Sequence, residues 1–293
     1  MEKPVIRISV RNLVEFILRN GDLESGGTAG DKEAMLKGSR LHRKIQKQMG
    51  SHYQAEVSLK KDTEYEDLIL RVEGRADGIF TQNEKICIDE IKGVYKNLEL
   101  LAEPVLVHRA QALCYAWIYL DDHGLEEIDV QMTYAHLDTE MIKRFRETMT
   151  REELESWYQR LLDSYHKWLS YQMKWREERN RSMEKLEFPF IYRKGQKEMV
   201  AGIYHAISRK EQIFIQAPTG VGKTMSAVFP AVRSIGEGKA ETLFYLTART
   251  ITRTVAQDAF EILRKNGLLF KTVTITAKEK LCFCEKPECN PET

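Results

Sequence analysis

The feature that most constrains this chain is a short segment with two glycines, Ala217-Pro-Thr-Gly-Val-Gly-Lys-Thr224. An apolar stretch at 212–217 leads into it, and a helical pattern follows. Glycine lets the backbone curl so that its amides point at an anion, and the N-terminus of the following helix favours negative charge. In such a loop the lysine neutralises phosphate charge and the last hydroxyl ligates Mg²⁺. The predicted ATP-binding residues of this loop are Ala217, Pro218, Thr219, Gly220, Val221, Gly222, Lys223 and Thr224, the last also as a Mg²⁺ ligand.

Length and charge divide the chain into two parts. At about 150 residues per domain, the length predicts about two domains. Residues 185–293 carry 17 Lys and Arg against 11 Asp and Glu, whereas residues 1–184 hold more acids than bases, so the net charge of +1 hides a contrast. We predict a first domain at 1–180, a linker at 181–187 in a highly charged stretch, and a second domain at 188–293. The net positive charge of the second domain favours binding to a polyanion.

Nothing in the sequence indicates a membrane protein. No apolar run approaches the roughly 18 residues that a membrane span needs. The N-terminus also lacks the apolar core of a signal peptide. The sequence therefore predicts a cytoplasmic protein without a membrane partner.

The residue pattern of the first part predicts a mixed α/β domain. Two runs rich in β-branched and apolar residues, 68–80 and 85–92, are separated by a turn at 81–84 and predict a β-hairpin. Apolar residues at helical spacing predict helices. The other predicted helices are 9–20, 34–48, 105–120 and 154–175, and the other predicted strands are 56–59, 127–137 and 142–149.

The second part has a different pattern. Strands are predicted at 212–217, 241–247 and 271–276. Helices are predicted directly after the glycine-containing loop and around 252–265. Strands that alternate with helices in this way indicate a parallel α/β sheet.

The segment before the glycine-containing loop resembles a motif of superfamily 2 helicases. Residues 188–196 read FPFIYRKGQ, which is similar to the adenine-binding Q motif of that family. The resemblance implies that Gln196 reads the edge of the adenine. It also implies that Tyr192 or Arg193 flanks the adenine ring.

The segment after the loop also resembles that family. Residues 245–250 read YLTART, which is similar to helicase motif Ia and implies that Arg249 and Thr250 contact a DNA backbone. No pair of acids follows the loop, because the chain's Asp-Glu dipeptide, Asp89-Glu90, lies far upstream. We therefore expect the N-terminal fragment of a longer helicase, which binds nucleotide but does not sustain hydrolysis.

Three cysteines near the end of the chain narrow the resemblance. Cys282-x-Cys284-x4-Cys289 is placed as in helicases of the XPD/DinG type, which carry a four-cysteine iron–sulfur cluster there. A 4Fe–4S cluster usually needs four thiolates, so at least one ligand would have to come from beyond residue 293. Zinc is the alternative metal, and free thiols are the alternative without a metal. Cys87 and Cys114 lie in apolar stretches and are interpreted as packing residues.

The predicted hairpin carries a second group of polar residues. Asp77 ends one strand, and the other strand reads Ile86-Cys-Ile-Asp-Glu-Ile-Lys92. The period of two places Glu90 and Lys92 on one face, within reach of Asp77, and Asp89 on the opposite face. Two carboxylates and a lysine suit Mg²⁺ or Mn²⁺ with oxygen ligands, and a metal held there lowers the pKa of its water.

This group resembles the RecB-like branch of the PD-(D/E)xK nuclease superfamily. His42 lies on the helix before the first core strand, which begins at Glu56, and Gln111 and Tyr115 match the family's QxxxY motif. Their spacing of four places both on one helix face. The resemblance implies Mg²⁺ or Mn²⁺ ligands at His42, Asp77 and Glu90, and catalytic roles for Asp77, Glu90, Lys92, Gln111 and Tyr115.

Together these features predict an α/β fold class, in which a PD-(D/E)xK nuclease-like mixed sheet with flanking helices is followed by the first part of a RecA-like helicase domain. The resemblances imply a 5′-to-3′ ATP-dependent DNA helicase with a metal-dependent nuclease domain, acting in DNA repair or related processing. The implied partner is DNA that is single-stranded or has a single-stranded overhang. One alternative is a nuclease-like domain that only grips DNA, and another is an unrelated ATPase or kinase.

Overall fold

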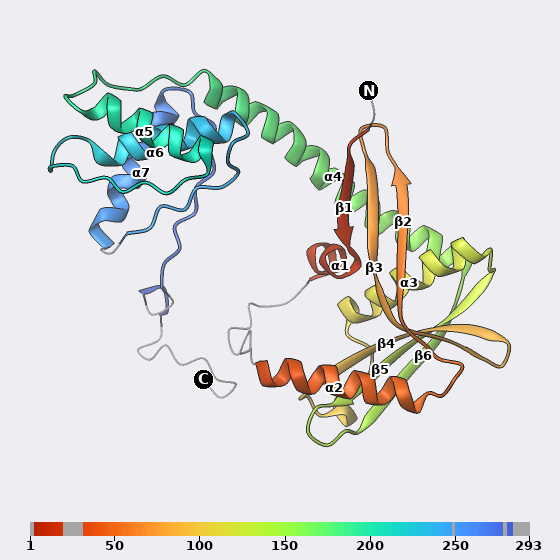
Figure 1. Cartoon of the computed structure of the whole chain (residues 1–293). Helices are drawn as coiled ribbons and strands as arrows, with labels where there is room; N and C mark the ends of the chain where they lie inside the picture. The colour runs from red at the N-terminus through yellow and green to blue at the C-terminus, as the bar shows by residue number, and fades with distance from the viewer. Residues whose placement is uncertain (1–2, 20–31, 248–249, 278–279, 284–293) are drawn as a thin grey trace. The chain divides into compact units, whose positions relative to one another are not determined.

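The computed structural model describes residues 3–19, 32–247, 250–277 and 280–283 (Figure 1). Two compact units, Met1–Trp168 and Leu169–Glu285, meet in sequence inside the helix α4, Arg151–Glu184. The linker predicted at 181–187 thus begins within a helix. Within the described ranges, none of the helices combines the length and the hydropathy that a bilayer crossing requires.

The first unit is built on one six-stranded mixed sheet with the order β1-β3-β4-β5-β6, in which β2 also pairs with β3. β1 is parallel to β3 and β4 is parallel to β5, while the other pairs are antiparallel. The predicted hairpin is confirmed as β3 and β4. The strands are β1 Val5–Ser9, β2 Gln54–Glu64, β3 Ile69–Gln82, β4 Lys85–Val94, β5 Glu127–His136 and β6 Ile142–Thr150.

One edge of β3 has a gap in its pairing. β2 covers the other edge between Ile69 and Ile79, except at Asp77. On the edge in question, β1 pairs with Ile69–Glu73, and pairing with β4 begins only at Gly78, opposite Asp89. Residues 74–77 therefore have no strand partner on this edge, and β4 continues beside β5 alone. The sheet opens between β3 and β4 at this point.

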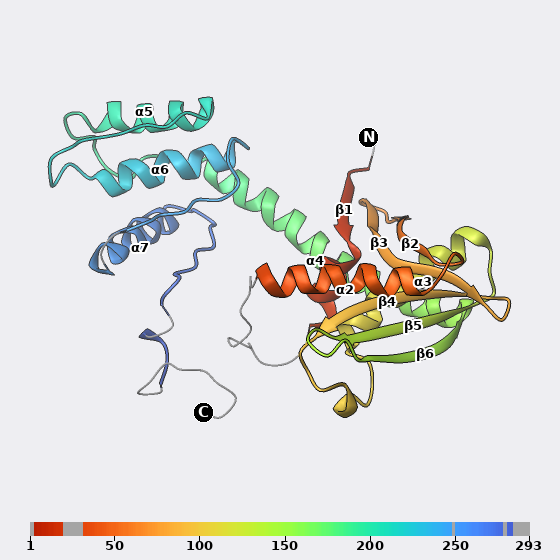
Figure 2. The ribbon, with the colours of Figure 1, turned by 60° about the horizontal axis from the view of Figure 1, so that its bottom comes forward.

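Two helices approach this opening from opposite faces of β4, as Ile91 contacts α2 and Lys92 contacts α3. α2 lies across the sheet in Figure 2, with Leu41 and Ile45 packed on Ile91. The α3 helix is almost wholly buried along its middle turns, as its apolar sequence predicts. The helices of this unit are α1 Val10–Leu18, α2 Lys32–Gln48, the short η1 Leu98–Leu100, α3 Leu106–His123 and the first part of α4.

The second unit contains the end of α4 with α5 Gln196–Arg209, α6 Lys223–Gly236 and α7 Thr250–Lys265. Its core joins Met183 of α4 to Val228 and Val232 of α6 and Leu263 of α7. The helix predicted after the glycine-containing loop is confirmed as α6, and the helix predicted around 252–265 is confirmed as α7.

The parallel sheet predicted for this unit is not formed by the described residues. The segments 212–217, 241–247 and 271–276 run without any strand pairing. Phe214, Leu246 and Val273 on them are 94%, 87% and 88% exposed. The prediction of strands was wrong for this structure, because β-branched and aromatic residues favour an extended chain whereas a strand also needs a neighbour to accept and donate its backbone hydrogen bonds.

Candidate functional site

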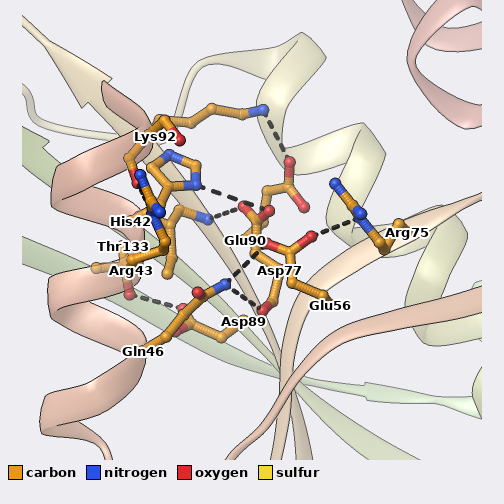
Figure 3. A network of polar contacts seen from close by, with 12 residues as sticks. His42, Arg43, Gln46, Glu56, Arg75, Asp77, Asp89, Glu90, Lys92 and Thr133 are labelled. Atoms are coloured by element: carbon orange, nitrogen blue, oxygen red, sulfur yellow. Dashed lines mark hydrogen bonds and ion pairs between the residues drawn. The ribbon is translucent and has the colours of Figure 1, made fainter. Parts of the chain in front are cut away.

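Asp77 occupies the opening between β3 and β4. Its Oδ2 accepts a hydrogen bond of 2.8 Å from the backbone amide of Ile91, in place of a bond between the strands. Its Oδ1 lies 3.8 Å from Nδ1 of His42, which reaches in from α2. Figure 3 shows the carboxylates of Asp77, Glu90 and Glu56 close together at this point.

Glu90, Lys92 and Gln111 form a chain of contacts on the α3 side. The ammonium Nζ of Lys92 lies 2.8 Å from Oε1 of Glu90 and donates to Oε1 of Gln111 at 2.6 Å. The second oxygen of Glu90, Oε2, is buried and has no hydrogen-bond partner among the described residues. Because a buried acceptor without a partner is costly, this oxygen is the place where the site fits an added ligand.

Tyr115 closes the unpaired stretch of β3. A Cβ built on Gly74 would lie 2.6 Å from the Tyr115 hydroxyl, so the ring fits only because residue 74 is glycine. Burial, and next the charge of Glu90, raise the pKa of Tyr115, which keeps its hydroxyl neutral. Gln111 and Tyr115 thus both reach this region from α3. We call the group of His42, Asp77, Glu90, Lys92, Gln111 and Tyr115 the hairpin site.

The carboxylates of the hairpin site resist ionisation. Burial, and next the neighbouring charge of Asp77, raise the pKa of Glu90 to about 8 against the partial opposition of Lys92. Burial also raises the pKa of Asp77, although His42 and the Ile91 amide favour its charged form. At neutral pH Glu90 is therefore largely protonated. A cation bound beside these acids would favour their ionised forms.

Three further residues belong to this region and were not among the predicted ligands or catalytic residues. Nε2 of Gln46 donates to Oε1 of Glu56 at 3.1 Å and to the backbone oxygen of Asp77 at 2.9 Å, and Arg75 Nε lies 2.5 Å from Oε2 of Glu56. Glu56 has a φ of 58°, which a strand residue rarely adopts. The spacing of four between His42 and Gln46 is a signal that could have found Gln46, since it places both on one face of α2.

Asp89 faces away from the hairpin site, as the period of two predicted. Its carboxylate accepts hydrogen bonds from Thr133 at 2.6 Å, Gln131 at 3.2 Å and Tyr53 at 3.1 Å. These neutral donors satisfy the carboxylate. Asp89 therefore joins neighbouring strands on the buried face of the sheet, and its side chain does not point into the site.

The hairpin site is suited to a metal by its chemistry more than by its present geometry. In the part of the chain that the structure describes, no three side chains of His, Cys, Asp or Glu lie close enough together to hold a metal ion as they stand. The unpartnered Glu90 oxygen and the adjacent His42 and Asp77 are nevertheless the nitrogen and oxygen donors that Mn²⁺ accepts. The residues fit such an ion once these side chains turn toward it.

The glycine-containing loop is followed by a helix, as predicted, but the strand predicted before it at 212–217 is not formed. Gly220 and Gly222 have φ of 84° and 79°, in the left-handed region, and α6 starts directly afterwards at Lys223. The ammonium of Lys223 donates to the backbone oxygens of Ala217 at 2.9 Å and Pro218 at 3.1 Å. The lysine thus closes the loop on itself, at the helix N-terminus that favours an anion.

The predicted adenine-reading residue lies against this loop. Gln196 is buried, and its Oε1 accepts a hydrogen bond of 3.0 Å from the backbone amide of Arg193, whose guanidinium donates to the backbone oxygen of Gly220. A Cβ on Gly222 would lie 2.5 Å from Nε2 of Gln196. We call Gln196 and residues 217–224 the loop site. Within the loop site, the hydroxyl oxygen of Thr224 lies 3.4 Å from the hydroxyl oxygen of Tyr245.

Some predicted residues cannot be placed. Arg249, Cys284 and Cys289 lie outside the described residues. Thr250 is the first residue of α7, and Cys282 is a partly exposed free thiol. The predicted DNA contact at motif Ia and the predicted cysteine ligands therefore stay predictions.

The segment that contains the loop site resembles helicases. Residues 193–282, less than a third of the chain, match the DEAD/DEAH box helicase family. The probable ATP-dependent helicase MJ0942 of Methanocaldococcus jannaschii is 43% identical over 49 residues, which are 17% of this chain and 7% of that protein. Both matches thus concern only part of the chain, and this chain spans a small share of the length of the relative that it matches.

A solved structure also covers much of the chain. The alignment with the crystal structure of SSO0001 covers 55% of this chain and 76% of the SSO0001 chain, at 18% identity and a TM-score of 0.36.

The contact between Gly222 and Gln196 gives a test of the loop site. Gly222→Ala places a side chain in a left-handed conformation and pushes Gln196 away, so we expect ATP affinity to fall about tenfold, or about 1.4 kcal/mol. Gly238→Ala is the matched control, because Gly238 has a φ of 72° but open space around its Cβ position. Both variants lose roughly 1 kcal/mol of stability from the backbone. Equal ATP affinity of the two variants in titration calorimetry would contradict the contact.

The raised pKa of Glu90 gives a second test, in the metal-free protein. The pKa is raised to about 8 from 4.5, so the folded state holds a proton that the unfolded state has released, and stability falls as pH rises through this range. We expect Glu90→Gln to be as stable as wild type near pH 4.5 and more stable by about 1–3 kcal/mol at pH 9. Urea denaturation measures this, with the exposed Glu66→Gln as control. A difference that does not grow with pH would refute the assignment.

Proposed function

We propose that this chain joins a RecB-like, PD-(D/E)xK-type nuclease domain to the nucleotide-binding part of an XPD/DinG-type helicase. The observation that carries the nuclease proposal is the convergence of six predicted residues on the opening between β3 and β4. The helicase proposal rests on the loop site and on the match of residues 193–282.

For the helicase part, the loop site supplies the elements of ATP binding. Backbone amides around Gly220 and Gly222 and the N-terminus of α6 favour the phosphates, and Lys223 would exchange its two carbonyl contacts for phosphate oxygens. Thr224 would ligate Mg²⁺. Gln196 would read the adenine edge, and either Tyr192, whose ring is stacked on Phe188 at 4.3 Å, or Arg193 would flank the adenine ring.

For the nuclease part, the residues that would hold a Mg²⁺ or Mn²⁺ ion are His42, Asp77 and Glu90. When bound, such an ion supplies a water of lowered pKa and stabilises charge on the phosphate under attack. Lys92 would orient that water or neutralise charge in the transition state. Gln111 holds the Lys92 ammonium at 2.6 Å and so fixes its direction. Tyr115 presents a neutral hydroxyl beside Glu90, which can donate a hydrogen bond to a phosphate oxygen.

Two finer parts of the proposal rest on sequence resemblance alone. The spacing of Cys282, Cys284 and Cys289 is the support for a 4Fe–4S cluster, which needs a fourth ligand. The role in DNA repair and the preference for single-stranded DNA come from the XPD/DinG and RecB resemblances. The alternative, a nuclease-like domain that only binds DNA, predicts binding without cleavage.

Removal of the loop lysine tests the helicase part. We expect Lys223→Ala to weaken ATP binding at least about tenfold, because the ammonium charge next to the phosphates is lost. Lys197→Ala, an exposed lysine on α5, should bind ATP like the wild type. Titration of each protein with Mg²⁺ and ATP makes the comparison. If Lys223→Ala and Lys197→Ala bind equally well, the loop site is not the nucleotide site.

Removal of the hairpin lysine tests the nuclease part. We expect Mn²⁺-dependent cleavage of a labelled single-stranded oligonucleotide to fall about 10²-fold or more in Lys92→Ala. Lys85→Ala is the control, because Lys85 lies at the other end of the same strand in an ion pair with Glu127. Equal cleavage by wild type and Lys92→Ala would show that the activity comes from elsewhere. Binding by the wild type without cleavage would instead favour the binding-module alternative.

A further inference from the structure

Helix α2 carries a row of positive charge beside the hairpin site. Arg40, Arg43 and Lys47 are spaced by three and four residues, so they lie along one face of the helix, and all three are exposed. The neighbouring face presents His42 and Gln46 to Asp77. We call Arg40, Arg43 and Lys47 the basic row. At 1.5 Å per helical residue it is roughly 10 Å long.

The basic row is not neutralised by described carboxylates. Two other lysines of α2 are paired, Lys37 with Asp138 and Lys44 with Glu140. Within the described ranges no acid forms an ion pair with any member of the row, and Arg43 uses its Nε to donate to a backbone oxygen in its own helix. The end groups of the row are therefore available to an anion from outside.

The basic row is held rigidly in place relative to the hairpin site. Leu41 and Ile45 of α2 pack on Ile91, between Glu90 and Lys92 in sequence. A Cβ on Gly93 of β4 would lie 3.7 Å from Cα of Gly38, so the helix and strand backbones approach closely there. Figure 3 shows Arg43 next to His42 on the α2 side of the site. The row thus lies on the same helix as His42 and Gln46, which contact Asp77.

The acids near the hairpin site would oppose an anionic substrate unless positive charge lies close by. The hairpin site gathers the carboxylates of Asp77, Glu90 and Glu56, and residues 1–184 carry an excess of acids. A phosphate chain would be repelled by this unit unless local positive charge compensates. Among the helices of the unit, α2 concentrates basic residues and holds a single acid, Glu33.

We infer that the basic row binds the sugar–phosphate backbone of a single nucleic-acid strand and leads it across α2 into the hairpin site. The row matches about three stacked nucleotides at a rise of ~3.4 Å per strand step. The inference rests on the proposed function, because the hairpin site gives the strand its destination. The contacts are to phosphates, so the row would position the strand without reading its sequence.

The test compares two triple variants of the whole chain. Arg40→Gln/Arg43→Gln/Lys47→Gln removes the basic row, and Arg7→Gln/Lys60→Gln/Arg160→Gln removes the same charges from exposed positions elsewhere in the unit. Fluorescence anisotropy with a labelled single-stranded oligonucleotide, in EDTA, measures binding without cleavage. We expect the first variant to bind at least about tenfold more weakly at low salt. The slope of log K against log salt should become less negative by about 2, at about 0.7 per contact.

The outcomes separate this inference from the nuclease proposal. Equal loss in both triple variants, no loss in the first, or no measurable binding by the wild type would overturn the inference. Tighter binding of the row to anionic phosphatidylserine vesicles than to the oligonucleotide would overturn the choice of partner. If the row governs binding but Mn²⁺ gives no cleavage by the wild type, the row stands and the nuclease proposal falls. Circular dichroism confirms that both variants are folded.

Discussion

The hydrogen bond from the Ile91 amide to the Asp77 carboxylate is the contact on which the hairpin site depends. It takes the place of a backbone bond where β3 and β4 stop pairing, so the sheet can open without leaving the Ile91 amide unsatisfied. A hydrogen bond contributes roughly 0.5–1.5 kcal/mol net, comparable to the strand contact that is lost. The opening then admits Tyr115 against Gly74 from one side and His42 from the other.

The sequence predicts the parts of this arrangement that follow from local geometry. A period of two separates Glu90 from Asp89, and a spacing of four aligns Gln111 with Tyr115, because strand and helix repeats act over a few residues. The contact of Gln46 with Glu56 depends on α2 crossing the opening, which no short-range pattern encodes. The prediction of strands in the second unit, such as 241–247, was wrong for a related reason. Strand pairing depends on two distant segments, which no short-range pattern specifies.

Under the proposed function, the two sites would favour phosphate by opposite means. The loop site would use backbone amides, a helix N-terminus and Lys223, whose ammonium now contacts two backbone carbonyl oxygens. The hairpin site would instead need a bound cation, because its acids oppose a phosphate when they ionise. Positive charge gathers on α2 in a unit with an excess of acids, whereas residues 185–293 carry 17 Lys and Arg against 11 Asp and Glu.

The buried oxygen of Glu90 shows that the first unit is not arranged for stability alone. A glutamine at this position would avoid the cost of ionising a carboxylate whose pKa is raised to about 8. Lys92 offsets only part of that cost, because its ammonium contacts Oε1 and leaves Oε2 without a partner. Perturbed and unsatisfied acids of this kind gather at sites where a bound ligand completes the contacts. Glu56 on the neighbouring strand has a strained φ, which is a further cost to the stability of the fold.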